Sequence, residues 1–285
     1  MSLFHVDGEL VPAGEACLPV RDRSLAYGDA AVETMRAYGG RIHRWEEHLT
    51  GLTRTCEALS IPVPDGLRAR IRETLSANDL ADARVDLTVT RGEGGDGPTP
   101  PSPGETDPTV VVAVDPLPRG GRKGSPPWDG PATVRTAATR VPPAAARPPG
   151  LRTAGDLTAV LARLELAEED EALVRDVDGA VVGGAASDAC FVDQGGIHAP
   201  DPETVPVSPG VVRGVAFEHA RDQGIPVTVG RYDPRDFRTA EEAFLASTTW
   251  GIRPVGSVDG VEVGSGPVTD LLRTVFANRI EAEFY

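Results

Sequence analysis

The sequence predicts a two-domain α+β protein, and three observations support this fold class. The chain has 285 residues, enough for two domains with separate cores. Segments typical of strands and of helices occur in mixed order along its whole length, without an internal repeat. A segment rich in Gly and Pro, 118–130, interrupts this pattern and is typical of a linker. We therefore expect a small N-terminal α/β domain over 1–117 and a larger C-terminal domain over 131–285.

The N-terminal domain is expected to consist of short strands and two helices. The first helix is indicated by Leu49, Leu52, Cys56 and Leu59, which recur at helical spacing, and a second covers about 66–78. The glycine- and proline-rich segment 91–108 is a loop. Alternating or wholly apolar runs predict strands at 4–7, 10–12, 32–38, 42–44, 85–90 and 110–114.

The C-terminal domain begins with an amphipathic pattern. A helix over 156–168 places Leu157, Val160, Leu161 and Leu164 on one face. Two further helices are expected over 211–222, directly after Ser208-Pro209-Gly210, and over 267–283. Strands are predicted at 171–175, 189–192, 196–198, 225–229, 242–247 and 255–258.

The composition limits the classes of partner. The net charge is −15 and the sequence pI about 4.8, which argues against nucleic acid because phosphate neutralisation requires a basic patch. No apolar run is long enough to span a membrane, and the N-terminus does not resemble a secretion signal, so a cytoplasmic protein is expected. Lys123 is the single lysine. Acidity with almost no lysine is typical of adaptation to a saline cytoplasm; a GC-rich genome is the alternative explanation for the missing lysine.

The cysteines and histidines do not predict a metal site. Cys17, Cys56 and Cys190 are widely spaced and form no CxxC or Cys–His pair, so three reduced, buried thiols are expected. The five histidines are scattered without the spacing of metal ligands.

Five segments, in order along the chain, carry a family resemblance. They are Tyr27–Arg36 (YGDAAVETMR), Trp45–Leu49 (WEEHL), Ala162–Glu165 (ARLE), Ser208–Arg213 (SPGVVR) and Thr248–Val255 (TTWGIRPV). Together they resemble the class IV aminotransferases, the pyridoxal-phosphate enzymes of fold type IV. This family includes branched-chain and D-amino-acid aminotransferases and aminodeoxychorismate lyases, and the Thr90-Arg91-Gly92 segment is similar to the lyase branch. The resemblance implies the two-domain class IV aminotransferase fold, a dimer and a pocket between the domains.

The resemblance also implies which residues the family's chemistry requires. A lysine amine bonds to the cofactor aldehyde, an acid faces the pyridine nitrogen, and an arginine holds the phosphate. By position, these places fall on Arg152, Gly183 and Gly51, and Val212 replaces a threonine near a helix start. A guanidinium stays protonated and is a poor nucleophile, so Arg152 cannot replace the amine. The resemblance therefore implies a member of the family without bound pyridoxal phosphate.

Other positions of the family's site keep residues that can bind a ligand. A residual phosphate cradle comprises Val211, Val212, Ser247 and Thr248, through backbone N–H groups and hydroxyls. Substrate-binding positions fall on Tyr27, Arg36 and Arg91. Arg152 itself either binds a carboxylate in the vacated pocket or is a surface residue. Lys123 could replace the family lysine only in a desolvated setting that lowers its pKa, and its Gly-Arg-Lys-Gly context is flexible.

Three functions remain open. The first, which the substitutions favour, is a diverged paralogue without transaminase activity that binds a small carboxylate or partners an active relative. The second is an active aminotransferase or aminodeoxychorismate lyase, with pyridoxal phosphate bound through Lys123. The third is a cofactor-independent lyase acting on a chorismate-like acid, with Arg91 and Arg152 holding carboxylates. Whether the chain pairs with itself or with a relative is likewise open.

Overall fold

The internal contacts of the chain divide it into two compact units. The computed structural model describes residues 2–102 and 104–285; Met1 and Pro103, the latter in the predicted loop 91–108, lie outside the described residues. Unit 1 comprises the residues up to Gly120 together with 151–155 and 284–285, and unit 2 comprises 121–150 and 156–283. The segment expected to be a linker, 118–130, is therefore divided at Gly120. The segment 151–155 belongs to unit 1, although the predicted limits assign it to the C-terminal domain.

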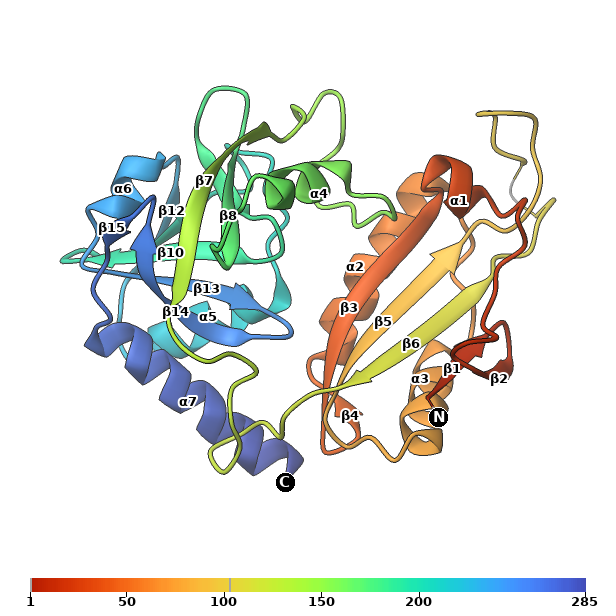
Figure 1. Cartoon of the computed structure of the whole chain (residues 1–285), viewed down its shortest axis with the longest axis horizontal. Helices are drawn as coiled ribbons and strands as arrows, with labels where there is room; N and C mark the ends of the chain where they lie inside the picture. The colour runs from red at the N-terminus through yellow and green to blue at the C-terminus, as the bar shows by residue number, and fades with distance from the viewer. Residues whose placement is uncertain (1, 103) are drawn as a thin grey trace. The chain divides into compact units, whose positions relative to one another are not determined.

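Unit 1 is built on an antiparallel sheet of six strands in the order β2-β1-β6-β5-β3-β4 (Figure 1). The long pairing of β3 with β5 runs from Ala30 opposite Thr90 to Ala37 opposite Ala83. This register brings Asp29, which precedes β3, and Arg91, which follows β5, to the same end of the two strands. The strands are β1 (Leu3–Val6), β2 (Glu9–Pro12), β3 (Ala30–Tyr38), β4 (Arg41–Ile42), β5 (Ala83–Thr90) and β6 (Val110–Pro116).

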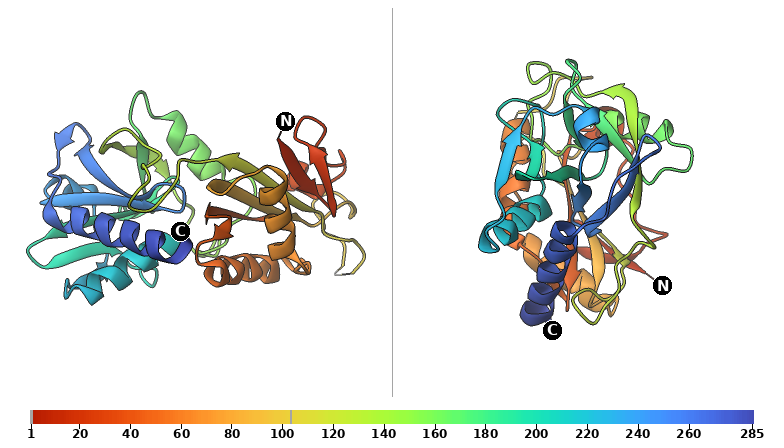
Figure 2. Two further views of the ribbon diagram at one scale, coloured as in Figure 1. Left: turned by 90° about the horizontal axis from the view of Figure 1, so that it is seen from below. Right: turned by 90° about the vertical axis from the view of Figure 1, so that its left-hand side faces the viewer.

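Two helices cover this sheet, and a one-turn helix, α1 (Arg23–Tyr27), precedes β3. Helix α2 (Trp45–Leu59) packs on β3, and α3 (Leu67–Ala77) packs on β1 and β6 (Figures 1 and 2). The fully buried core side chains between them include Met35, Leu52, Ile71 and Leu87. Burial of each such side chain stabilises unit 1 by roughly 1.5–3 kcal/mol.

Unit 2 contains a mixed sheet of nine strands. The order is β12-β11-β10-β13-β14-β7-β8-β9, with β15 paired to β14. Strand β7 is parallel to both β14 and β8, and β11 is parallel to β12. The strands are β7 (Ala132–Arg140), β8 (Glu171–Arg175), β9 (Val181–Gly184), β10 (Asp188–Asp193), β11 (Gly196–Pro200), β12 (Val227–Gly230), β13 (Glu242–Ser247), β14 (Gly251–Val258) and β15 (Val261–Glu262).

The helices of unit 2 are α4 (Leu157–Leu164), α5 (Val211–Asp222), α6 (Pro234–Arg238) and α7 (Pro267–Phe284), whose last residue belongs to unit 1. Helix α4 is shorter than the predicted 156–168. Asp156 caps its first turn by accepting a hydrogen bond from the Ala159 N–H at 3.3 Å. Glu165 ends the helix, and its carboxylate accepts a hydrogen bond from the Thr139 N–H of β7 at 2.9 Å.

Two further expectations were wrong. No strand was predicted over β7, although its sequence ATVRTAATR contains Thr and Val residues that favour strands. Its hydrogen bonds to β8 and β14, both distant in sequence, make it a strand. Cys17 is exposed, whereas Cys56 and Cys190 are buried, and all three thiols are free.

No helix of the described residues is long and apolar enough to cross a membrane.

Candidate functional site

The sequence-predicted site residues lie in separate places within the two units. In unit 1, Tyr27 and Arg91 lie at the end of the sheet where β3 begins and β5 ends. Arg36 lies near the other end of β3, about 20 Å away for six residues of extended chain. Its buried guanidinium donates to the Pro118 carbonyl at 3.0 Å and stacks 4.6 Å from the Tyr38 ring. The structure thus brings Tyr27 and Arg91 to one region and leaves Arg36 outside it.

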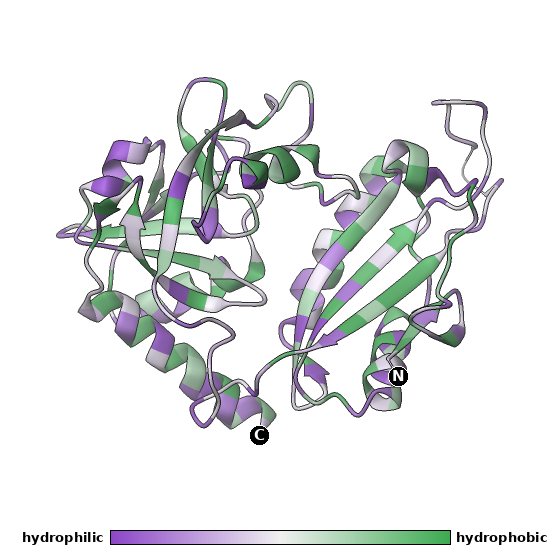
Figure 3. Cartoon of the chain, viewed as in Figure 1, coloured by the Kyte–Doolittle hydropathy of each residue, from purple (hydrophilic) through white to green (hydrophobic). Residues whose placement is uncertain are grey.

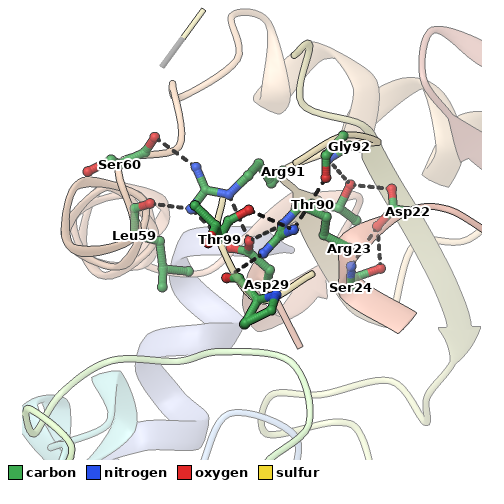
Figure 4. Close-up of polar contacts among 12 residues, drawn as sticks. Asp22, Arg23, Ser24, Asp29, Leu59, Ser60, Thr90, Arg91, Gly92 and Thr99 are labelled. Atoms are coloured by element: carbon green, nitrogen blue, oxygen red, sulfur yellow. Dashed lines mark hydrogen bonds and ion pairs between the residues drawn. The ribbon is translucent and has the colours of Figure 1, made fainter. Parts of the chain in front are cut away.

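Asp29 joins two buried arginines at that end of the sheet (Figure 4). Arg91 binds it with both ends of its fork, Nε to Oδ2 at 2.7 Å and Nη2 to Oδ1 at 3.0 Å. Arg23 donates from Nε to the same Oδ2 at 2.9 Å. Burial raises the pKa of Asp29, but hydrogen bonds and charge from Arg91 and Arg23 outweigh it and hold the pKa below its ordinary value. The carboxylate therefore stays ionised between two cations.

The remaining donors of the two arginines bind main-chain carbonyls. Arg91 donates to Leu59 and Ser60, where a cation is favourable beside the C-terminus of α2. Arg23 donates to Gly97 at 3.0 Å and Pro98 at 3.1 Å, and so holds the glycine-rich loop. These contacts give Arg91 a structural role; its substrate-binding role stays a prediction. Tyr27 is half exposed, with the Arg23 guanidinium 4.6 Å from its ring.

A second polar cluster lies between β3 and α2. Glu33 and His48 are 3% and 2% exposed, and the His48 Nδ1–H donates to Glu33 Oε1 at 2.7 Å. The other carboxylate oxygen, Oε2, is buried without a hydrogen-bond partner among the described residues. A buried carboxylate with an unfilled oxygen is costly unless a cation lies nearby.

Arg152 supplies that cation. The segment around it runs along β3: Val32 N–H donates to the Arg152 carbonyl at 2.9 Å, and Ala154 N–H donates to the Ala30 carbonyl at 3.0 Å. This pairing holds the Arg152 side chain, 31% exposed, with Nε 3.7 Å from Glu33 Oε2. The main chain of Arg152 also donates to the Thr55 hydroxyl at 3.2 Å. Arg152 is therefore neither a loose surface residue nor fully buried.

Gly51 lies beside the same carboxylate in the middle of α2. A Cβ at this position would meet only Glu33 Oε2, at 3.5 Å, which is ordinary van der Waals contact. The glycine is not required by its backbone, because its φ is helical rather than left-handed. The position therefore has room for a larger side chain.

Replacing Gly51 with alanine is expected to raise the free energy of unfolding by about 0.5–1 kcal/mol, because alanine is the better helix former and fits without collision. Chemical denaturation of the two proteins measures the difference. Gly66→Ala, at the left-handed position before α3 (φ 73°), is the matched control and should be destabilising. A loss of stability in Gly51→Ala would contradict the space described beside Glu33.

Lys123, in unit 2, does not lie in a desolvated setting. Its side chain is 69% exposed, and its Nζ is 3.8 Å from Glu281 Oε1 of α7. A nucleophilic lysine requires a desolvated pocket or a neighbouring cation, whereas this ammonium is solvated and lies beside a carboxylate. As placed here, Lys123 is therefore a poor nucleophile.

The residual cradle residues of unit 2 meet at the N-terminus of α5. Asp188 on β10 pairs with Ala246 on β13, directly before Ser247 and Thr248, and accepts a hydrogen bond from the Gly210 N–H at 2.9 Å. Val211 and Val212 open the helix behind this contact. Asp188 is 8% exposed and 3.8 Å from Arg213. A protein carboxylate thus accepts one N–H group at the start of the helix, where its negative charge opposes a bound phosphate.

Gly183 has a backbone that disfavours side chains. Its φ is +147°, and a Cβ would lie 3.1 Å from the Ser187 carbonyl oxygen. The neighbouring buried acid is Glu171 of β8, whose Oε2 accepts hydrogen bonds from the Ser187 hydroxyl at 2.9 Å and the Ala186 N–H at 3.2 Å. Glu171 therefore holds the turn between β9 and β10.

Sequence reasoning missed Glu33, His48, Glu171 and Asp188 as a set of buried polar groups. One signal was present: His48 lies one helical turn before Leu52, in the apolar stripe of α2, and Glu33 lies in an apolar strand. Among the described residues, no group of three or more His, Cys, Asp or Glu side chains could hold a metal ion.

Comparison with known proteins shows what this chain resembles. Residues 30–258 match the family model described as amino-transferase class IV. The branched-chain-amino-acid aminotransferase of Salmonella typhimurium is 30% identical over 285 residues, covering 95% of this chain and 90% of that protein. The crystal structure of 4-amino-4-deoxychorismate lyase from Pseudomonas aeruginosa is 32% identical, with a TM-score of 0.81, and covers 99% of this chain and 100% of that chain.

A further solved structure is similar in fold over nearly the whole chain. The branched-chain aminotransferase of the thermophilic archaeon Thermoproteus uzoniensis, solved with norvaline, is 22% identical with a TM-score of 0.87. The match covers 99% of this chain and 97% of that chain. The two-domain fold predicted from the sequence is therefore confirmed.

Proposed function

Because the chain belongs to the class IV aminotransferase family, we propose that it is a diverged member that does not carry out pyridoxal-phosphate transamination and binds a small carboxylate through Arg152. The observation that carries this proposal is the Arg152 side chain. By family resemblance it stands in the place of the lysine, and it carries a guanidinium that is partly exposed and held beside Glu33. A guanidinium suits a carboxylate, which it can bind with two parallel hydrogen bonds.

The side chains of this chain fit pyridoxal phosphate poorly. No lysine other than Lys123 is present, and its ammonium is exposed and paired with Glu281. At Gly183, in the place of the family acid, the glycine backbone disfavours a side chain. At the phosphate end, the Asp188 carboxylate already accepts from the N-terminus of α5. Each observation supports a site that has lost the cofactor.

Added pyridoxal phosphate followed by borohydride is expected to leave the side chains of the protein unmodified, because the amine of Lys123, the single lysine, is exposed beside Glu281 rather than desolvated. Absorbance and intact mass after reduction measure this. Lys123→Ala separates a side-chain adduct from one at the N-terminus. A stoichiometric adduct that maps to Lys123 and is lost in Lys123→Ala would overturn the proposal.

Carboxylate binding is tested separately with benzoate as the probe. Titration calorimetry is expected to detect saturable binding that weakens at least tenfold in Arg152→Gln. Arg147→Gln, an equal change of charge at an exposed ion pair with Asp156, is the matched control and should bind as the original protein does. Equal binding by both variants would remove Arg152 from the proposal.

A second candidate is an active aminotransferase or aminodeoxychorismate lyase. The 32% identity to the Pseudomonas aeruginosa lyase over the whole chain favours it, and it requires the Lys123 adduct described above. A cofactor-independent lyase is less well supported, because Arg91 would have to release Asp29 to hold a substrate carboxylate.

The partner surface that we propose is the exposed face of α4. Figure 3 shows this helix largely in the hydrophobic colour. Its exposed apolar side chains form one stripe: Leu157 is 64% exposed, Val160 54%, Leu161 44% and Leu164 75%. A contiguous apolar stripe of this kind marks a protein contact. A second copy of the chain is the expected occupant, with an active relative as the alternative.

Replacing both Leu161 and Leu164 with glutamate is expected to convert the dimer to a monomer, because two charges would be buried at the contact. Light scattering after size exclusion measures the mass. Val177→Glu, at an apolar side chain 57% exposed elsewhere on unit 2, is the control and should remain a dimer. A dimer in the double variant would place the contact elsewhere.

A further inference from the structure

Unit 2 contains an open cleft of about 590 Å³ into which four arginines converge. They are Arg175, from the end of β8, and Arg231, Arg235 and Arg238, from the segment that leads into and forms α6. Helix α6 and strand β8 are labelled in Figure 1. Four guanidiniums around one cleft are notable in a chain whose net charge is −15.

Three of these arginines are held in position by contacts outside their own segment. Arg238 Nη1 lies 2.6 Å from Asp259 Oδ2, and Arg231 Nη2 lies 3.1 Å from Asp176 Oδ2. Arg175 Nη2 donates to the Ala137 carbonyl at 2.8 Å. Each contact uses only part of a fork that carries five N–H donors, so each cation is oriented and keeps donors for another acceptor.

Two of these arginines have donors that no acceptor of the described residues fills. Arg175 Nε is buried without a hydrogen-bond partner among the described residues. Burial, followed by the neighbouring charge of Arg140, lowers the pKa of Arg175, although the charges of Asp259 and Glu165 oppose this shift. Arg235 is exposed at the rim, and its side chain has no hydrogen bond or ion pair within the described part of the chain.

The acids that line the cleft do not satisfy these arginines fully. Asp233 Oδ1 accepts from the Arg235 N–H at 2.6 Å, and Asp236 Oδ2 accepts from the Asp233 N–H at 2.7 Å, so both acids cap α6. Asp178 is 77% exposed and lies 3.8 Å from Arg231. The hydroxyl of Tyr232, another lining residue, is bonded to His198 Nδ1 at 3.1 Å.

We propose that this cleft binds a phosphorylated small molecule, with its phosphoryl group held by Arg175, Arg235 and Arg238. The fork of a guanidinium matches the oxygens of a phosphoryl group, and several forks suit its two charges better than they suit a single carboxylate. The volume lies within the range of about 300–1,000 Å³ that small-molecule sites occupy. The site is formed by unit 2 alone and does not depend on the function proposed for Arg152.

The test is calorimetric titration of the whole protein with pyrophosphate at constant ionic strength set by potassium chloride. One saturable site per chain is expected, with affinity at least tenfold weaker in Arg235→Gln. That substitution removes no described side-chain contact, so its melting temperature should match that of the original protein. Arg122→Gln, an exposed arginine of unit 2 outside the cleft, is the charge-matched control and should bind normally.

The proposal would be overturned by absence of saturable binding, or by equal weakening in Arg122→Gln and Arg235→Gln, which would indicate a general counterion effect. Arg238→Gln is a second cleft variant. It should also bind at least tenfold more weakly, and unchanged binding in both cleft variants would place the anion elsewhere.

Discussion

Replacing Asp29 with alanine is expected to lower the free energy of unfolding of unit 1 by about 3–5 kcal/mol. The change leaves two buried guanidiniums, those of Arg23 and Arg91, without their shared carboxylate. The loop held by Arg23 and the end of α2 held by Arg91 would loosen together. Guanidinium chloride denaturation followed by circular dichroism measures the loss.

Two variants make the Asp29 result interpretable. Asp29→Asn keeps the shape but removes the charge, and should lose less stability than the alanine variant. Glu47→Ala breaks an exposed ion pair with Arg44 in the same unit and should cost at most about 1 kcal/mol. If Asp29→Ala and Glu47→Ala were equally stable, the buried network would not support unit 1.

The contribution of Asp29 should depend on pH in a defined direction. Its pKa in the folded chain lies below the ordinary value of 3.8, so folding favours the ionised form. The stabilisation is therefore complete above the ordinary value and is lost as pH falls through the folded pKa. The difference in stability between the original protein and Asp29→Asn should be constant from neutral pH to about pH 5 and shrink below about pH 4.

Replacing His48 with alanine is the second change with a large expected effect. It should lower the free energy of unfolding by about 3–5 kcal/mol. The change removes the donor to Glu33 Oε1 and leaves a buried carboxylate whose nearest charge is Arg152, 3.7 Å from Oε2. It also leaves a cavity between β3 and α2. The same denaturation experiment measures the effect.

The matched control replaces both partners with apolar residues of similar size, as Glu33→Met with His48→Leu. Removing both polar groups avoids an uncompensated buried charge, so the double variant should be more stable than His48→Ala. If the double variant were the less stable of the two, the pair would contribute net stability, and the explanation by an unpaired carboxylate would fail.

Much of the fold could be predicted from local sequence patterns. Leu52 and Cys56 of α2 are buried as their helical spacing predicts, and Val110, Val112 and Val114 of β6 are buried, whereas Val111 and Ala113 are only partly buried. The family resemblance supplied the two-domain fold, which short motifs in a constant order indicate. Strand β7 was missed, although its Thr and Val residues favour a strand; its place in the sheet depends on pairing with β8 and β14, which are distant in sequence.

The sequence by itself determined the family, the single lysine and the presence of Arg152 within its segment. Only the tertiary structure decided what surrounds these residues. It placed the main chain of Arg152 along β3, which brings its guanidinium to Glu33, and it directed Arg91 to Asp29. It also exposed the apolar stripe of α4, which the sequence pattern alone could not distinguish from a buried one. The physical reason is that helical and strand periodicity depends on neighbours a few residues apart, whereas burial and charge pairing depend on residues brought together by distant segments.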